Sequence, residues 1–270
     1  MVEISSKYKI GTRRFGSVNW IGTWTLYKKE VLRFLNVWIQ TIFSPLVSAL
    51  LFLLVLSLAI GTDKGNVLGV PFINFLAPGL VAMQVIQQSF SHSASSFMIG
   101  KIQGNIVDIL YAPLSAGEVT FAITLAAVTR SVMIAFISIC IFHLIIDFEI
   151  KNYFILILYT FLSSFILGAL GIVAGLWAEK FDHMATVTNF IIVPLSFLSG
   201  TFYTIDKLPV YIQIISKANP FFYMIDGFRY SFIGQSDGSL TIGLIYLITL
   251  SFIMFMIAYI LYKKGYKIKS

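Results

Sequence analysis

Uninterrupted apolar stretches of about 20 residues recur along this sequence, and they constrain its fold more than any other feature. A helix of that length crosses the roughly 30 Å hydrocarbon core of a bilayer while it pairs every backbone group internally. The composition agrees, because 58% of the 270 residues are hydrophobic and 11% are charged, whereas soluble domains carry about a quarter charged residues. The sequence therefore predicts an all-α membrane protein with a single transmembrane domain, residues 1–270.

Length and the absence of charge predict six membrane spans. The spans are expected at residues 37–60, 70–91, 119–142, 153–177, 184–202 and 240–262. Six spans place both termini on one side, and Lys and Arg are concentrated in the terminal segments 1–36 and 263–270 of that side. Because cytoplasmic segments retain positive charge, both termini are predicted to be cytoplasmic in a bacterial inner membrane. The net charge of +7 comes from these ends, so no nucleic-acid partner is expected.

An amphipathic helix is predicted just before the first span. Its apolar side chains recur at helical spacing at Trp20, Trp24, Tyr27, Val31 and Phe34. Its other face carries Lys28, Lys29, Glu30 and Arg33. Tryptophans at headgroup depth and lysines beside anionic lipid would make Trp20, Trp24, Lys28 and Lys29 interfacial anchors on the cytoplasmic leaflet. The alternative is that this helix only extends the first span inward.

A second amphipathic helix is predicted between the second and third spans, over Gly100–Pro113. Its apolar side holds Ile102, Ile106, Ile109 and Leu110, and its polar side holds Lys101, Asn105 and Asp108. Ser115 and Glu118 then have the spacing of a capping box that would start the third span. Such a helix could receive a push from a motor protein, although an ordinary interfacial loop helix has the same pattern.

Arg130 lies inside the third predicted span, where an unpaired charge costs roughly 3 kcal/mol or more. The side chain must therefore point away from lipid, toward a partner such as Glu118, Asp182 or a backbone carbonyl. A residue of a transport pathway and a structural tether between helices both fit this position.

The segment 203–239 is unusually apolar for a loop, so it is expected to fold back into the outer side of the membrane as a helical hairpin. The first helix is predicted between Asp206–Pro209 and Asn219, and the second from Phe221 to a stop at Gly234. Candidates for the translocation path or outer gate are Phe202, Tyr203, Phe222, Tyr223 and Arg229. An aromatic belt at the membrane interface would explain the same rings. Asp226 and Arg229 are spaced to form an ion pair on a helix.

No constellation for catalysis is found in the sequence. It has no HExxH motif, no histidine cluster and no GxxxxGK[ST] phosphate loop. His92, His143 and His183 lie apart and are expected to be satisfied histidines at the membrane interface, and the lone Cys140 excludes a disulfide framework. The chain is therefore predicted not to be an enzyme, and no catalytic, metal or cofactor-binding residue is assigned.

Five strings, in this order, resemble the type 2 ABC exporter permeases. They are Asn74–Leu80, Ile109–Ser115, Trp177–Asp182, Pro194–Tyr203 and Asn219–Arg229. The resemblance extends over nearly the whole chain and is greatest to compact bacterial members, which include nodulation-factor, capsule and O-antigen export permeases.

The resemblance implies a homodimer or pseudo-dimer of six-helix permease subunits, with the homodimer preferred, bound to two cytoplasmic ATPase subunits that hold ATP and Mg. It also implies that residues 96–111 form the coupling helix and that the helices after the fifth span lie beside the outer part of the path. The predicted function is export of a glycan, a lipid-linked saccharide or a hydrophobic drug-like compound. The alternatives are a membrane assembly factor and an ion-coupled secondary transporter, which usually needs ionisable residues at mid-membrane.

Overall fold

The computed structural model describes residues 16, 18–60, 66–147 and 149–268, and these residues are mostly helical. The helices are α1 Trp20–Leu35, α2 Ser44–Ile60, α3 Phe72–Ile102, α4 Ile106–Tyr111, α5 Ala116–His143, α6 Tyr153–Trp177, α7 Phe181–Val187, α8 Val193–Phe197, α9 Val210–Ala218, α10 Pro220–Ile233 and α11 Leu240–Lys263. Two π-helical turns, η1 Ile39–Phe43 and η3 Thr188–Ile192, and a 3-10 turn, η4 Ile205–Lys207, supplement them. Strand β1 Asn66–Val67 pairs antiparallel with β2 Val70–Pro71. The prediction of an all-α membrane protein is confirmed.

Four of the helical stretches are long and apolar enough to cross a membrane. They are Ile39–Ala59, Ala116–His143, Tyr153–Trp177 and Leu240–Lys263. The predicted second span, 70–91, begins in β2 and continues in α3, which has 31 residues but carries several glutamines and serines. The predicted fifth span corresponds to α7, η3 and α8, where a π-helical turn interrupts the helix. The number of six spans therefore remains a prediction.

Each π-helical turn lies directly before a proline near the start of the next helix. Pro45 follows η1, and Pro194 follows η3. Proline has no backbone N–H to donate to the carbonyl four residues back, so the helical hydrogen-bond pattern must change there. Both interruptions coincide with such a proline, whereas Pro78 lies inside α3 without a π-helical turn.

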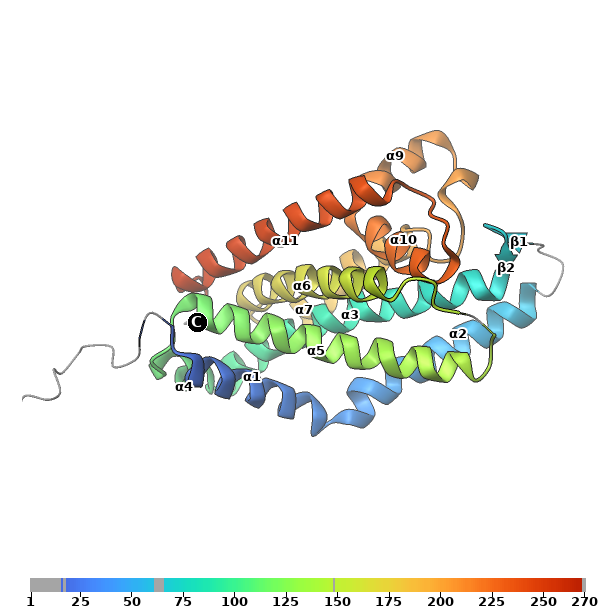
Figure 1. Cartoon of the computed structure of the whole chain (residues 1–270). Coiled ribbons are helices and arrows are strands. Elements are labelled where there is room, and N and C mark those ends of the chain that lie inside the picture. The colour runs from blue at the N-terminus through green and yellow to red at the C-terminus, as the bar shows by residue number, and fades with distance from the viewer. Residues whose placement is uncertain (1–15, 17, 61–65, 148, 269–270) are drawn as a thin grey trace, which may run out of the picture.

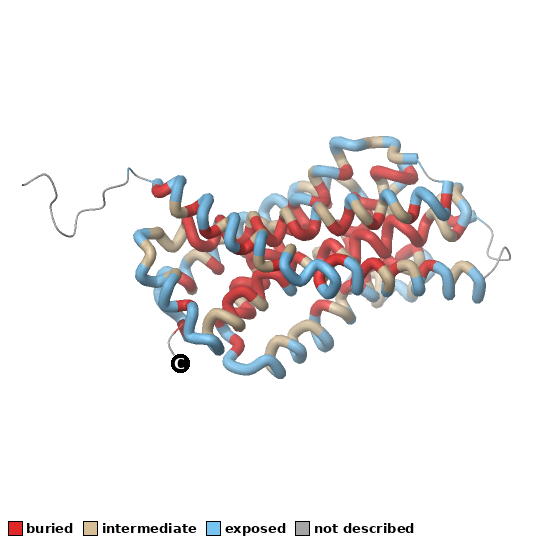
Figure 2. The backbone as a smooth tube through the Cα atoms, turned by 90° about the horizontal axis from the view of Figure 1, so that it is seen from below, coloured by how far each residue is buried: buried red, intermediate tan, exposed pale blue. Residues whose placement is uncertain are grey.

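The long helices form a bundle with distinct ends (Figure 1). At one end lie α1, α4 and the C-terminal end of α11, and at the other lie the β1–β2 hairpin, α9 and α10 (Figure 1). Buried residues are concentrated in the middle of the bundle, and the outer helices are largely exposed (Figure 2). Among the 18 most apolar consecutive residues of each stretch, 22% are buried in Ile39–Ala59 and 11% in α11, against 67% in α6.

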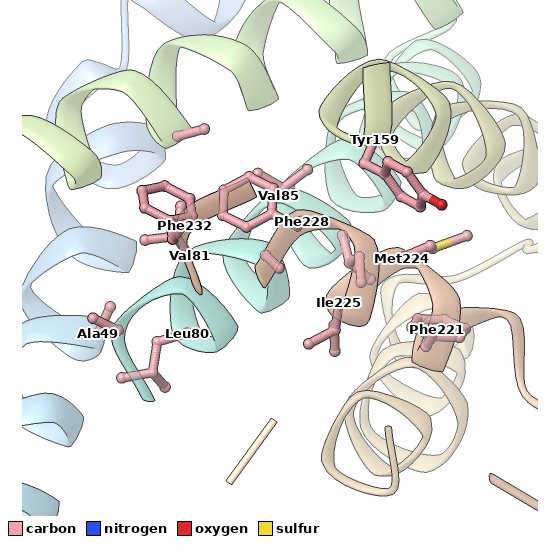
Figure 3. Close-up of a cluster of buried hydrophobic side chains, with 14 of the residues drawn as sticks. Ala49, Leu80, Val81, Val85, Tyr159, Phe221, Met224, Ile225, Phe228 and Phe232 are labelled. Carbon is pink, nitrogen blue, oxygen red and sulfur yellow. The ribbon is translucent and has the colours of Figure 1, made fainter. Parts of the chain in front are cut away.

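Helix α10 is built into the apolar core rather than lying on the surface. The labelled side chains in Figure 3 come from α2, α3, α6 and α10, and they include Ala49, Leu80, Val85, Tyr159 and Phe228. The expected pair of short helices is present as α9 and α10. Gly234, with φ +77°, ends α10 where the sequence predicts a stop.

Candidate functional site

The segment predicted as a coupling helix, residues 96–111, is broken in the structure. Lys101 and Ile102 are the last residues of α3, Gly104 has φ +75°, and α4 begins at Ile106. The prediction of one continuous amphipathic helix over Gly100–Pro113 is therefore wrong. The reason is the left-handed backbone at Gly104, which a glycine adopts without steric cost and which redirects the chain.

Burial in this segment also differs from the expected pattern. Ile106 is 5% exposed and packs in an apolar cluster with Leu26 and Phe97. Ile109 is half-buried, and Asn105 is exposed. Five exposed side chains lie around these residues: Ile102, Val107, Asp108, Leu110 and Tyr111. We call them the coupling surface, after the role that the resemblance predicts for residues 96–111. Val107 and Tyr111 were not predicted, because they lie off the apolar face that the periodicity indicates.

Lys101 holds the end of α3 against the end of α6. Its Nζ donates hydrogen bonds to the carbonyl oxygens of Leu176, at 2.8 Å, and Ala178. These carbonyls are among the unpaired acceptors at the C-terminal end of α6. Beyond that end, Glu179 accepts a hydrogen bond from Lys267 at 2.7 Å. This bond lowers the pKa of Glu179 and raises the pKa of Lys267.

Helix α1 buries a different face from the one that its sequence indicates. Glu30, expected on the polar face, is 1% exposed, and its carboxylate accepts a hydrogen bond from Arg33 Nε at 2.9 Å. The predicted anchors Trp20 and Trp24 are 69% and 63% exposed, and Lys28 and Lys29 are exposed as well. His92 of α3 lies beside Glu30 on the buried side of α1, and both tryptophans lie on its exposed side.

Glu118 joins the start of α1 to the start of α5. Its two carboxylate oxygens accept hydrogen bonds from the backbone N–H groups of Asn19, at 2.7 Å, and Ser115, at 2.6 Å. The Glu118 N–H in turn lies 3.4 Å from Ser115 Oγ, which completes the predicted capping box. Glu118 lies roughly 18 Å before Arg130 along α5, so these two side chains do not pair.

Arg130 is 6% exposed and donates a hydrogen bond to the side-chain oxygen of Gln88 on α3. Of the expected partners, Glu118 accepts a hydrogen bond from the Asn19 N–H, and Asp182 is exposed on α7. Since Gln88 is a neutral amide, the guanidinium has no anionic hydrogen-bond partner in the part of the chain that the structure describes.

Arg130 lines a polar groove of about 750 Å³, bounded by the end of α1, the start of α2, one face of α3 and α5. Its polar lining residues are Arg33, Gln40, Thr41, Ser44, Ser48, Gln84, Gln87, Gln88, Ser91, Ser95, Gln103 and Arg130. We call this the polar groove. The residues from α3 were not predicted to line a groove. The signal was the helical spacing of Gln84, Gln87, Gln88 and Ser91, which places these polar side chains on one face of a predicted span.

Two of the residues predicted to line an outer path are buried inside the chain. Arg229 and Phe222 are 1% and 2% exposed, so neither faces open space, whereas Phe202, Tyr203 and Tyr223 are half-buried. The expected Asp226–Arg229 pair is replaced by other bonds. Asp226 accepts hydrogen bonds from the N–H groups of Asp237, at 2.8 Å, and Gly238, at 3.1 Å.

His92 is fully buried rather than interfacial. Its ring packs edge-on to Phe34, with centroids 5.6 Å apart, and its Nε2 lies 3.8 Å from Glu30 Oε2. Arg33 Nη2 donates a hydrogen bond to the His92 carbonyl at 3.0 Å. These contacts fix the end of α1 on α3, beside the polar groove.

Known proteins are similar to this chain over most of its length. A family model described as ABC-2 type transporter matches residues 22–233. The inner membrane transport permease YadH of Escherichia coli strain K12 is 30% identical over 253 residues, which cover 93% of this chain and 98% of the relative. Nodulation protein J of Rhizobium leguminosarum bv. viciae is 25% identical over 233 residues, 84% of this chain and 86% of the relative.

Proposed function

This chain belongs to the ABC-2 type transporter family, and from that premise we propose that it is the permease subunit of an ATP-driven exporter. Members of the family are transmembrane subunits and are not themselves ATPases. We propose that a separate cytoplasmic subunit binds ATP and Mg and docks on this chain. The cargo would leave the cytoplasm as a glycan, a lipid-linked saccharide or a hydrophobic compound.

The coupling surface carries this proposal. Tyr111 is 86% exposed, Ile102 51% and Val107 44%, and they lie at the end of the bundle where α4 joins α3 to α5. Exposed apolar side chains in such a group are typical of a protein contact. Because Ile106 beneath them is buried against Leu26 and Phe97, a force on α4 would pass into α1 and α3.

We further propose a homodimer in a bacterial inner membrane with both termini cytoplasmic and six spans. The E. coli relative is named an inner membrane transport permease. In α2, Leu51 and Leu58 are 56% and 75% exposed, and Phe190 in η3 is 78% exposed. Lipid or a second copy would cover these apolar side chains.

The proposal is tested by purifying the tagged full chain from its native bacterium and identifying the proteins that accompany it. We expect an ABC ATPase subunit, and we expect Tyr111→Asp to remove it. Tyr211→Asp is the matched control, since Tyr211 is also well exposed, at 67%, but lies on α9 at the opposite end. ATP-driven transport by the purified chain alone, or equal loss of the ATPase in both variants, would contradict the proposal.

A further inference from the structure

The polar groove reaches from one end of the bundle toward the middle of the bundle. It follows α3 from Gln103, just beyond the last turn, back to Gln84. At 1.5 Å per residue, these positions are separated by roughly 28 Å along the helix. The groove could therefore admit a ligand from the end at which the coupling surface lies.

The lining of the groove is unsuited to lipid chains. Gln84, Gln87 and Gln88 are only half-buried, and they share one face of α3. An amide group that faces hydrocarbon without a hydrogen-bond partner costs several kcal/mol. Gln87 Nε2 is buried and has no partner within the described chain. Such a surface requires water or a polar ligand beside it.

The charge of the groove is positive. Arg33 and Arg130 line it, and no Asp or Glu of the described residues does. Arg33 is partly neutralised because its Nε binds Glu30. Arg130 has only the neutral Gln88 as a side-chain partner, and its buried Nε makes no hydrogen bond within the described residues. A cationic ligand would be repelled, whereas an oxyanion would supply the missing acceptor.

Given the exporter function proposed above, on which this inference rests, we propose that the polar groove binds the anionic headgroup, a phosphate or carboxylate, of an amphiphilic cargo. The guanidiniums of Arg130 and Arg33 bind the oxyanion. The amides and hydroxyls along α3 and α2 bind neighbouring hydroxyl groups. A groove of about 750 Å³ holds a group larger than phosphate itself, such as a phosphate with an attached sugar. Among the cargo classes considered, this favours a lipid-linked saccharide over a hydrophobic compound.

The test is equilibrium binding of radiolabelled dodecyl phosphate to the purified full chain in dodecyl maltoside, a neutral detergent with the same chain length. We expect saturable binding that dodecyltrimethylammonium does not displace. Arg130→Gln and Arg33→Gln should each weaken it by roughly tenfold or more, because a charge-assisted hydrogen bond is lost. Lys28→Gln removes the same charge from an exposed site on α1 that does not line the groove, and it should bind as the unmodified chain does.

Absence of saturable binding, or equal weakening in Lys28→Gln, would overturn the proposal. If Arg130→Gln does not fold, Arg33→Gln decides by itself, because Arg33 is the other cation that lines the groove. A bulk membrane lipid is the other source of such a headgroup. Nanodiscs of phosphatidylcholine and of phosphatidylglycerol separate the two, since equal affinity in both supports a cargo site and loss of binding in phosphatidylglycerol overturns it. The assay needs no ATPase, so its failure would leave the exporter function standing.

Discussion

The guanidinium carbon of Arg229, on α10, lies 3.8 Å from the centroid of the Phe75 ring on α3. Its Nη2 also donates hydrogen bonds to the carbonyl oxygens of Gly200, at 2.8 Å, and Thr201, at 3.2 Å. Gly79, one turn after Phe75, leaves space for this contact, because a Cβ there would lie 2.8 Å from Arg229 Nη2. One buried cation thus joins α3, α10 and the turn after α8.

Replacing this cation should loosen the end of the bundle at which α9 and α10 lie (Figure 1). We expect Arg229→Met to lower the free energy of unfolding by about 2–3 kcal/mol, because it leaves two carbonyls without their donor and removes the cation–π contact. Thermal unfolding of the purified chain in detergent measures the effect. Lys217→Met, at an exposed position on α9, is the control, and equal stability of the two variants would show that Arg229 does not hold this end together.

Adjacent positions in α4 should separate folding from coupling. Ile106 is 5% exposed and Val107 is 44% exposed. Ile106→Asp buries a carboxylate in an apolar cluster and should lower the unfolding temperature or prevent accumulation of the protein. Val107→Asp should leave the unfolding temperature unchanged and reduce copurification of the ATPase. The assignment of the coupling surface fails if Val107→Asp retains full ATPase association.

Elements whose limits depend on local chemistry agree well with the sequence predictions. The fourth predicted span, 153–177, has the same limits as α6, because Asn152 caps its first turn by accepting from the Ile155 N–H at 3.0 Å. α10 likewise ends at Gly234. In both cases the residue that sets the limit, Asn152 or Gly234, is adjacent to its helix in the sequence.

Features that depend on distant partners could not be predicted. Glu30 was predicted on the polar face of its helix. It is buried because α1 packs on α5 and because His92 of α3 lies beside it. His92 is about 60 residues further along the chain, so this contact has no local sequence signal. The break at Gly104 was missed since the apolar period continues across it from Ile102 to Ile106. A periodic pattern indicates which residues share a face, but not what covers that face.

The close approach of α3 and α6 gives a prediction for their glycines. A Cβ on Gly171 would lie 2.5 Å from the carbonyl oxygen of Phe90, a backbone atom that cannot move without shifting α3. Gly171→Ala gains up to about 1 kcal/mol in helix propensity, but overpacking costs about 1–3 kcal/mol. We expect a net loss of thermal stability. Gly117→Ala on α5 is the control, because its nearest contact would be an ordinary 3.8 Å to Tyr259, and a loss as large as that of Gly171→Ala would refute this explanation.

The double hydrogen bond of Glu118 predicts how α1 is attached. In Glu118→Gln, one acceptor oxygen becomes an amide N–H₂ group that faces the N–H of Asn19 or Ser115. One buried donor is thus left unpaired, at a cost of about 1–3 kcal/mol. We expect α1 to detach more often, and limited trypsin digestion to cleave faster after the exposed Lys28 and Lys29. Glu179→Gln, which breaks an exposed ion pair with Lys267, should not change that rate. Unchanged cleavage in Glu118→Gln would mean that contacts along α5, such as Tyr27 Oη to Thr129 Oγ1 at 2.8 Å, are sufficient to hold α1 in place.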